Sequence, residues 1–171
     1  MSKSAAIFTL ASVEYLRMNL PRIDKCLGML SEEKVWWTPN GHVNSIGNLI
    51  LHLSGNVTQW ILSGIGGAED VRERDLEFST TGGHNKADLY NKIEAVVEQA
   101  AEVIRQMDAD VLAQKYNIQG FDNTGYGVVI HVIEHFSYHT GQIALMTKLL
   151  ENQDLGFYAD DDLNQLNEDV S

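Results

Sequence analysis

Residues 131–142 read His131-Val-Ile-Glu-His135-Phe-Ser-Tyr-His139-Thr-Gly-Gln142. Residues four apart lie on one face of a helix, about one turn from each other, so a histidine pair at this spacing can bind one metal ion. His131 and His139 are separated by roughly 12 Å of helix rise, whereas metal–nitrogen bonds are only about 2 Å long. One pair therefore binds the ion and the third histidine has another role; the spacing alone leaves open which pair it is.

This stretch belongs to the last of four helical patterns along the chain. Apolar residues recur at helical spacing over residues 4–30, 44–64, 86–107 and 124–151. Asn44 or Ser45 is expected to cap the second helix, and Pro21 to kink the first or divide it in two. The stretches 69–85 and 108–123 are expected to be linkers, because no alternating strand pattern of useful length is present. The sequence predicts an all-α fold, a four-helix bundle with long connections.

Composition narrows the class of protein. A length of 171 residues, 44% of them hydrophobic, fits one domain, which we divide into a bundle of residues 1–152 and an acidic tail of residues 153–171. Twelve basic residues against twenty-four acidic ones give a net charge of −12. Such a surface repels phosphate backbones and anionic lipids, so nucleic acids and membranes are excluded as partners. Cys26 is the single cysteine, which excludes an internal disulfide and a cysteine-rich zinc site.

Neither a targeting segment nor a membrane span is expected. The apolar run of residues 5–13 is followed at once by Glu14 and Arg17, and no cleavage site of small residues closes it. Residues 43–68 contain no Lys, Arg, Asp or Glu, but their amide, hydroxyl and imidazole side chains would be costly in a bilayer. The sequence therefore predicts a cytoplasmic protein whose second helix is buried in the bundle.

A polar stripe without charge runs along this second helix. It is formed by Ser45, Asn48, His52, Asn56 and Gln59. Solvated helix faces usually carry charged residues, and the last helix is similar, since Glu134 is its only charge between Thr124 and Thr147. We interpret the two stripes as facing walls of a shielded cavity, where neutral imidazoles bind a metal and nearby amides orient them. The alternative is that His52 is a hydrogen-bonded core histidine with no metal.

Two common metal sites are excluded. A zincin helix carries glutamate directly after the first histidine of its pair, but Phe136 follows His135 and Val132 follows His131. Glu134 precedes His135 and is expected at the surface. A di-iron bundle needs Glu-x-x-His pairs, and the chain contains none. The hypotheses of a zincin-type hydrolase and of a di-iron oxidase are therefore weakened.

The aromatic and thiol side chains are assigned to packing. Trp36, Trp37 and Trp60 are expected to lie in the core or to form pocket walls. Cys26 is expected to be a small buried apolar residue, since no cluster of basic residues activates it.

The other polar candidates lie in loops or beside the histidines. His42 and His84 fall in turn or linker sequence and are expected to be exposed. Tyr138 and Gln142 flank the histidine pairs on the last helix and are candidates to contact a substrate, as are Asn48 and Asn56 on the second helix. Ordinary packing near the bundle core is the alternative for Tyr138 and Gln142.

The order of these motifs resembles that of the DinB-like (YfiT-type) superfamily. The resemblance is carried by Asn48-Leu-Ile-Leu-His52-Leu, by His135-x-x-x-His139-Thr-Gly-Gln142 and by the loop Trp36-Trp37-x-Pro39. It covers most of the chain, from about residue 8 to residue 150.

This resemblance implies a four-helix bundle that binds a divalent metal ion, commonly nickel or zinc, through three histidines. Matched position by position, the implied ligands are His52, His135 and His139, with His131 outside the triad. It also implies a homodimer and, for some members, a thiol S-transferase activity that uses low-molecular-weight thiols; many members have no established activity.

Three functions remain open from the sequence. In the first, the ion activates a bound thiol or water for attack on a small-molecule substrate. In the second, the chain is a non-catalytic metal- or ligand-binding dimeric module, which the lack of a visible general base favours. In the third, the histidines are purely structural.

Overall fold

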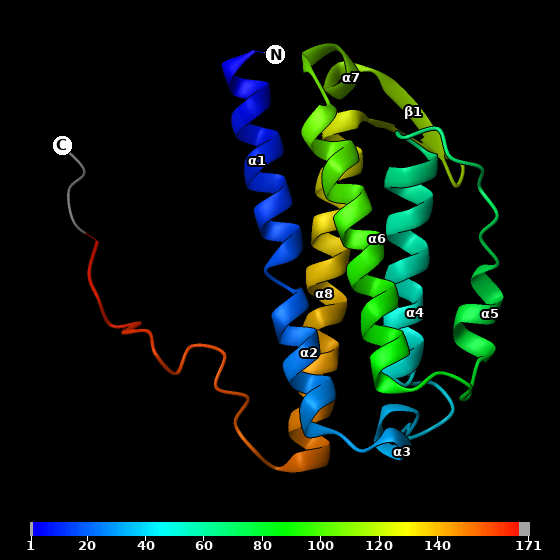
Figure 1. Ribbon diagram of the computed structural model, residues 1–171, viewed down its shortest axis with the longest axis vertical. Coiled ribbons are helices and arrows are strands. Elements are labelled where there is room, and N and C mark those ends of the chain that lie inside the picture. The colour runs from blue at the N-terminus through cyan, green and yellow to red at the C-terminus, as the bar shows by residue number, and fades with distance from the viewer. Residues whose placement is uncertain (1, 168–171) are drawn as a thin grey trace.

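The long helices form a bundle in which the second and third helical segments run in one direction and the first and fourth in the other, as the computed structural model of the chain shows for residues 2–167 (Figure 1). The bundle consists of α1 (Lys3–Arg17) with α2 (Leu20–Met29), α4 (Ile46–Val57) with the π-helix η1 (Thr58–Ser63), α6 (Lys86–Gln106) and α8 (Gly125–Glu151). The prediction of an all-α fold built on four long helical segments is confirmed. Among residues 2–167, no helix is both long and apolar enough to cross a bilayer.

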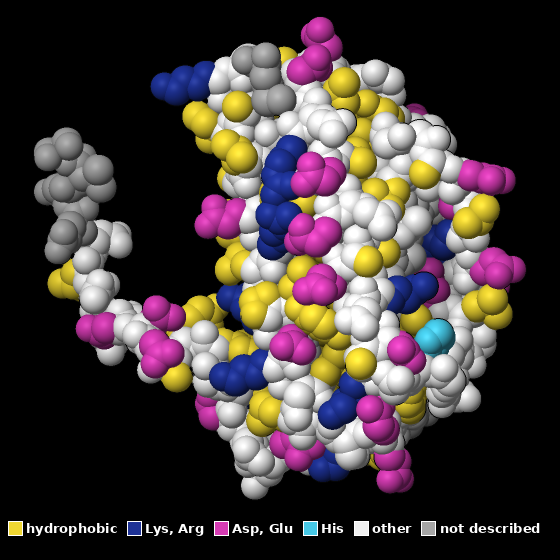
Figure 2. All heavy atoms as spheres, in the orientation of Figure 1, with side chains coloured by type: hydrophobic (Ala, Val, Ile, Leu, Met, Phe, Trp, Pro, Cys, Tyr) yellow, Lys and Arg dark blue, Asp and Glu magenta, His cyan; other side chains and the backbone are white. Residues whose placement is uncertain are grey.

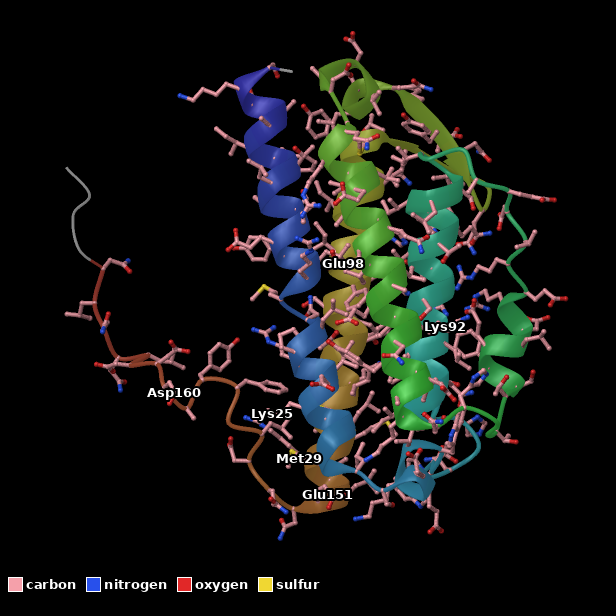
Figure 3. The ribbon with its side chains drawn as sticks, in the orientation of Figure 1. Lys25, Met29, Lys92, Glu98, Glu151 and Asp160 are labelled. Carbon is pink, nitrogen blue, oxygen red and sulfur yellow. The ribbon has the colours of Figure 1, made fainter. Side chains whose placement is uncertain are left out.

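The first helical segment is divided in two, as Pro21 predicts. The α-helical pattern stops after Arg17 and resumes at Leu20, with Pro21 in the first turn of α2, where its missing N–H costs no hydrogen bond. The side-chain amide of Asn19 donates to the carbonyl of Tyr15 at 3.0 Å and satisfies a backbone group at the break. Arg17 then ties α1 to α6, since its Nε donates to Oε1 of Glu98 at 2.8 Å (Figure 3).

The start of α4 is fixed by reciprocal side-chain caps. Oγ of Ser45 accepts from the backbone N–H of Asn48, and Oδ1 of Asn48 accepts from the backbone N–H of Ser45, both at 3.1 Å. This capping box sets the helix register from its first turn. All residues of α4 except Gly55 are buried, which agrees with the uncharged composition of the segment.

The connections contain more regular structure than the sequence predicts. A short helix, α3 (Glu32–Val35), follows α2, and another, α5 (Arg74–Ser79), lies in the linker of residues 69–85. The stretch 108–123 holds α7 (Ala109–Ala113) and an antiparallel hairpin of β1 (Lys115–Ile118) and β2 (Phe121–Thr124). The expectation that the chain has no strand is therefore wrong at this one place.

A two-residue turn produces the hairpin. Gln119 and Gly120 have φ values of 54° and 82°, and positive φ at both central residues is the backbone twist that joins two strands tightly. Glycine adopts this conformation freely, but glutamine rarely does. The Gln119 side chain is held in place, since its Oε1 accepts from Nε1 of Trp60 at 3.1 Å. This tertiary contact is not visible in the local sequence pattern.

The core lies along the axis of the bundle and receives apolar side chains from all four segments. Its largest fully buried side chain is Phe136 of α8, and α6 contributes one buried face made of Leu89, Ile93, Val97, Ala100, Ala101 and Ile104. Val97 takes the core position on this face, and Val96 beside it is only half-buried.

The chain after α8 stays on the bundle for several residues. Leu155 is only 2% exposed, Nζ of Lys25 donates to the carbonyl of Gly156 at 3.1 Å, and Arg22 donates to the Tyr158 hydroxyl at 2.7 Å (Figure 3). Farther on, the segment runs away from the helices (Figure 1). The division at residue 152 stays a proposal, and the last four residues of the acidic tail, 168–171, lie outside the described residues.

Candidate metal centre

Three histidines from two helices meet inside the bundle. His52 lies on α4, and His135 and His139 lie one turn apart on α8, which packs against α4. One ring nitrogen of each histidine lies within 4.8 Å of the corresponding nitrogens of the other two. Nε2 of His52 is 2.9 Å from Nε2 of His135. The structure therefore brings together the two segments that are 83 residues apart in the sequence.

The donor set fits a divalent transition metal. Around a tetrahedral ion, metal–nitrogen bonds of about 2.0–2.1 Å place the ligand nitrogens about 3.3 Å from one another. Small movements of the three rings would bring their nitrogens to this spacing. His52 is 5% exposed, and the other two histidines are half-buried. Burial, and after it the positive charges of the neighbouring imidazoles and of Arg72, lowers the pKa of His135 to about 3. Burial also lowers the pKa of His139. Both rings are therefore neutral at pH 7, as ligation requires.

A carboxylate holds the far side of His52. Oε2 of Glu77 lies 2.9 Å from Nδ1 of His52, and Glu77 is itself bound by Arg72 through Nε at 2.7 Å and Nη2 at 2.8 Å. Burial alone raises the pKa of Glu77, but the hydrogen bonds and charges of Arg72 and His52 outweigh it and hold this pKa below its ordinary value. The expectation of a cavity without charges is therefore wrong at this side of the site.

Sequence reasoning missed Glu77 and Arg72 because both belong to the linker between α4 and α6. Charged residues in a polar linker are usually solvated, and no spacing rule connects them to a histidine on the preceding helix. Gly55 is the one local signal. A Cβ at this position would lie 1.9 Å from Oε1 of Glu77, so α4 carries glycine where the carboxylate approaches.

Asn48 fastens this linker to α4. Its Nδ2 donates to the carbonyls of Glu77 at 2.9 Å and of Thr80 at 2.6 Å, while its Oδ1 completes the helix cap. The side chain of Asn48 thus has its donors and acceptor engaged by the backbone. The ring of Phe78, next to Glu77, lies 4.7 Å from the ring of His52 and covers it.

Gln142 orients His139. Its Oε1 lies 2.7 Å from Nδ1 of His139 and accepts the proton of that nitrogen, which leaves Nε2 to serve as a ligand atom. Tyr138 contacts the His139 ring edge-on at 5.0 Å, but its side chain is 59% exposed and lines a groove between α1 and α8. Of the two flanking residues on α8, Gln142 supports the histidine cluster, whereas Tyr138 faces the groove between α1 and α8.

His131 lies outside the cluster, packed between aromatic rings. Its ring is 4.0 Å from that of Trp60 and stacks at 5.5 Å on that of His135. Burial lowers its pKa. Among the tryptophans, Trp60 is buried and Trp36 is half-buried over Gly47, as predicted, but Trp37 is 44% exposed. Trp37, which is expected in the core or in a pocket wall, lies at the surface instead, because the loop after α3 turns its ring outward.

Asn56 presents a buried polar group to the interior. It lies one turn after His52 on the same face of α4 and is 4% exposed. Within residues 2–167, its Oδ1 has no hydrogen-bond partner. Buried acceptors are almost always satisfied, so this oxygen is available to a donor on a bound molecule.

The remaining candidates lie where the sequence places them. His42, His84 and Glu134 are exposed, and Cys26 is buried, with burial raising the pKa of its thiol. None of these four side chains belongs to the histidine cluster formed by the described residues.

The chain matches one family model and is similar in fold to several solved structures. The model of a family described as "Protein of unknown function (DUF1572)" matches residues 5–159. A conserved protein from Enterococcus faecalis is similar in structure, with a TM-score of 0.73 and 15% identity over 85% of this chain and 98% of that chain.

Two proteins whose solved structures are called DinB-like are also similar, each with a TM-score of 0.64. The one from Bacillus subtilis is 14% identical over 84% of this chain and 94% of its own, and the one from Bacillus cereus is 17% identical over 83% and 90%. No curated protein matches the chain. At these identities the likeness shows the fold, which is DinB-like.

Proposed function

Since the chain belongs to the DUF1572 family, whose function is unknown, and has the DinB-like fold, we propose a function from its own site: it binds one divalent metal ion through His52, His135 and His139. The observation that carries this proposal is the convergence of three imidazoles from two helices within 4.8 Å. Glu77 behind His52 and Gln142 behind His139 are the kind of hydrogen-bonded support that metal-ligating histidines receive. Nickel and zinc both suit an all-imidazole donor set.

We further propose that the site serves a metal-dependent thiol S-transferase. A divalent ion held by neutral imidazoles supplies a Lewis acid that favours the deprotonated form of a thiol or of water. The thiol would release its proton to solvent, its sulfur would form a bond to an electrophilic carbon of a small-molecule substrate, and the leaving group would depart with the electron pair of the broken bond. Asn56 would position a substrate donor through its free Oδ1, while the ring of Phe78 covers that of His52 and Trp60 packs on the neighbouring His131.

A thiol assay tests this activity. The metal-loaded protein is incubated with several low-molecular-weight thiols and a chromogenic electrophile, and we expect turnover that a chelator abolishes and added metal restores. His135→Ala is expected to be inactive, whereas His42→Ala, which removes an exposed histidine, keeps full turnover. Silence of the metal-loaded protein across the whole panel would contradict the transferase proposal and favour a binding module.

The second candidate function is a non-catalytic metal- or ligand-binding dimeric module. The observation that favours it is the engagement of Glu77, the carboxylate beside the cluster, by both Arg72 and His52. A carboxylate so bound does not act as a free general base.

We also propose that the chain is a homodimer through α1 and α8. These helices enclose an apolar groove of about 740 Å³, along which Tyr15, Ile130 and Tyr138 are 56–60% exposed. Figure 2 shows hydrophobic side chains at the surface along α1. Monomers seldom leave large apolar patches in water.

Light scattering checks the oligomeric state. We expect twice the chain mass of 19.1 kDa for the wild type and for Phe121→Glu, an exposed position on the hairpin. Tyr15→Glu places a charge in the groove and is expected to give the single-chain mass. A wild-type mass of one chain would contradict the dimer.

The net charge of −12 supports a small-molecule substrate over nucleic acid, and the single free cysteine supports a cytoplasmic location.

A further inference from the structure

We propose that Glu77, held in place by Arg72, is a positioning residue that fixes His52 as the tautomer with its proton on Nδ1 and its lone pair on Nε2. This inference rests on the proposed metal site and extends it to the linker between α4 and α6. It makes the short helix α5 part of the centre, although α5 contributes no ligand.

The hydrogen bonds around Nδ1 of His52 decide the tautomer. An ionised carboxylate has only acceptors, so a lone pair on Nδ1 would face the negative Oε2 of Glu77 at 2.9 Å. Nη2 of Arg72 lies farther from Nδ1, at 3.2 Å, and already donates to the same Oε2 at 2.8 Å. The favourable arrangement therefore has Nδ1–H donating to Glu77. Nε2 is then unprotonated and lies in the cluster, 2.9 Å from Nε2 of His135.

Arg72 keeps the carboxylate in this position. Its side chain is only 4% exposed, and that of Glu77 is 10% exposed, so the pair is shielded from water. Nε and Nη2 of Arg72 donate to the two oxygens of Glu77, and Nη1 donates to Oε1 of Gln59 on η1 at 2.9 Å. Such a two-pronged contact fixes direction as well as charge. The guanidinium is thus anchored to one helix while it orients the carboxylate.

The backbone provides the room and the attachment. Gly55 leaves the space that Oε1 of Glu77 occupies, since a Cβ there would lie 1.9 Å away. Asn48 binds the carbonyls on either side of Phe78, so the linker cannot slide along α4 without losing these bonds. The Nδ1 proton of His52 is therefore supported by four side chains from different segments: Asn48, Gln59, Arg72 and Glu77.

Imidazole NMR tests the proposal on metal-free protein. Long-range ¹H–¹⁵N spectra of the histidine rings should show His52 as the Nδ1–H tautomer in the wild type. In Glu77→Ala we expect this ring to shift toward the Nε2–H form. Asp75→Asn changes an exposed carboxylate on the same helix and is expected to leave the His52 signals unchanged.

Metal titration supplies the second readout. Loss of a carboxylate behind a metal-ligating histidine typically weakens metal affinity about 10–100-fold, and we expect this loss for Glu77→Ala with Zn²⁺ or Ni²⁺. Glu77→Gln is expected to lose less, because the amide oxygen can still accept from Nδ1. If Glu77→Ala does not fold, Gly55→Ala serves instead: it displaces the carboxylate with a methyl group, and alanine is the better helix former.

The outcomes separate this inference from the metal proposal. An Nε2–H tautomer of His52 in the wild type, or an unchanged tautomer in both Glu77→Ala and Gly55→Ala, would overturn the role of Glu77. A purely structural role would lower thermal stability without changing the ring nitrogen shifts of the folded protein. If the wild type binds no metal while the tautomer shifts as expected, the metal proposal fails and the positioning of His52 by Glu77 stands.

Discussion

His52→Ala, His135→Ala and His139→Ala are each expected to lose the bound metal ion, whereas His131→Ala keeps it. Each of the first three variants removes one of the nitrogens that lie within 4.8 Å of each other. Two imidazoles cannot replace the third, so affinity should fall by more than the roughly 100-fold that loss of a supporting residue costs. His131 packs on Trp60 instead and offers no ligand.

Metal analysis of the purified variants after equilibrium dialysis measures this directly. We expect about one ion per chain for the wild type, for His131→Ala and for the exposed control His42→Ala, and almost none for the other three. Full metal occupancy in His139→Ala would refute the assignment. So would loss of the metal in His131→Ala while His139→Ala keeps it.

Phe136→Ala is expected to destabilise the fold by about 3–5 kcal/mol, the usual cost of emptying a fully buried aromatic site. Phe136 directly follows His135, and helix geometry turns it about 100° away, into the core. Its burial therefore sets the rotation of α8 that directs His135 and His139 toward α4. Urea unfolding followed by circular dichroism gives the change in free energy.

The matched control is Phe121→Ala. Phe121 is 63% exposed on the hairpin, so its loss should change the free energy of unfolding by only about 0.5 kcal/mol. A cost below about 1 kcal/mol for Phe136→Ala would mean that this ring is not in the core, and the orientation of α8 would have to be revised.

The sequence predicts the long helices well because their causes are local. The capping pair of Ser45 and Asn48, the break before Pro21 and the apolar spacing of α6 all act within a few residues. The hairpin is missed because its turn places Gln119 at a positive φ that glutamine seldom adopts, and a contact with Trp60 stabilises it. Local propensity does not contain that contact.

The candidate site follows the same division. Polar residues without charge on two helices predict a shielded interior, and the histidines of both stripes do meet there. Asn48 lies on the predicted stripe, yet its amide binds the linker backbone, since the linker packs against the N-terminal end of the stripe. Glu77 could not be found in this way, because its contact with His52 forms only when the linker folds back onto α4, and no local pattern encodes that contact.

A crystal structure of the metal-loaded protein, with anomalous diffraction collected at the absorption edge of the added metal, tests the central claim most directly. We predict one anomalous peak per chain, about 2.0–2.1 Å from Nε2 of His52, His135 and His139. A peak bound by His131, or a metal-loaded protein with no peak between α4 and α8, would contradict the account.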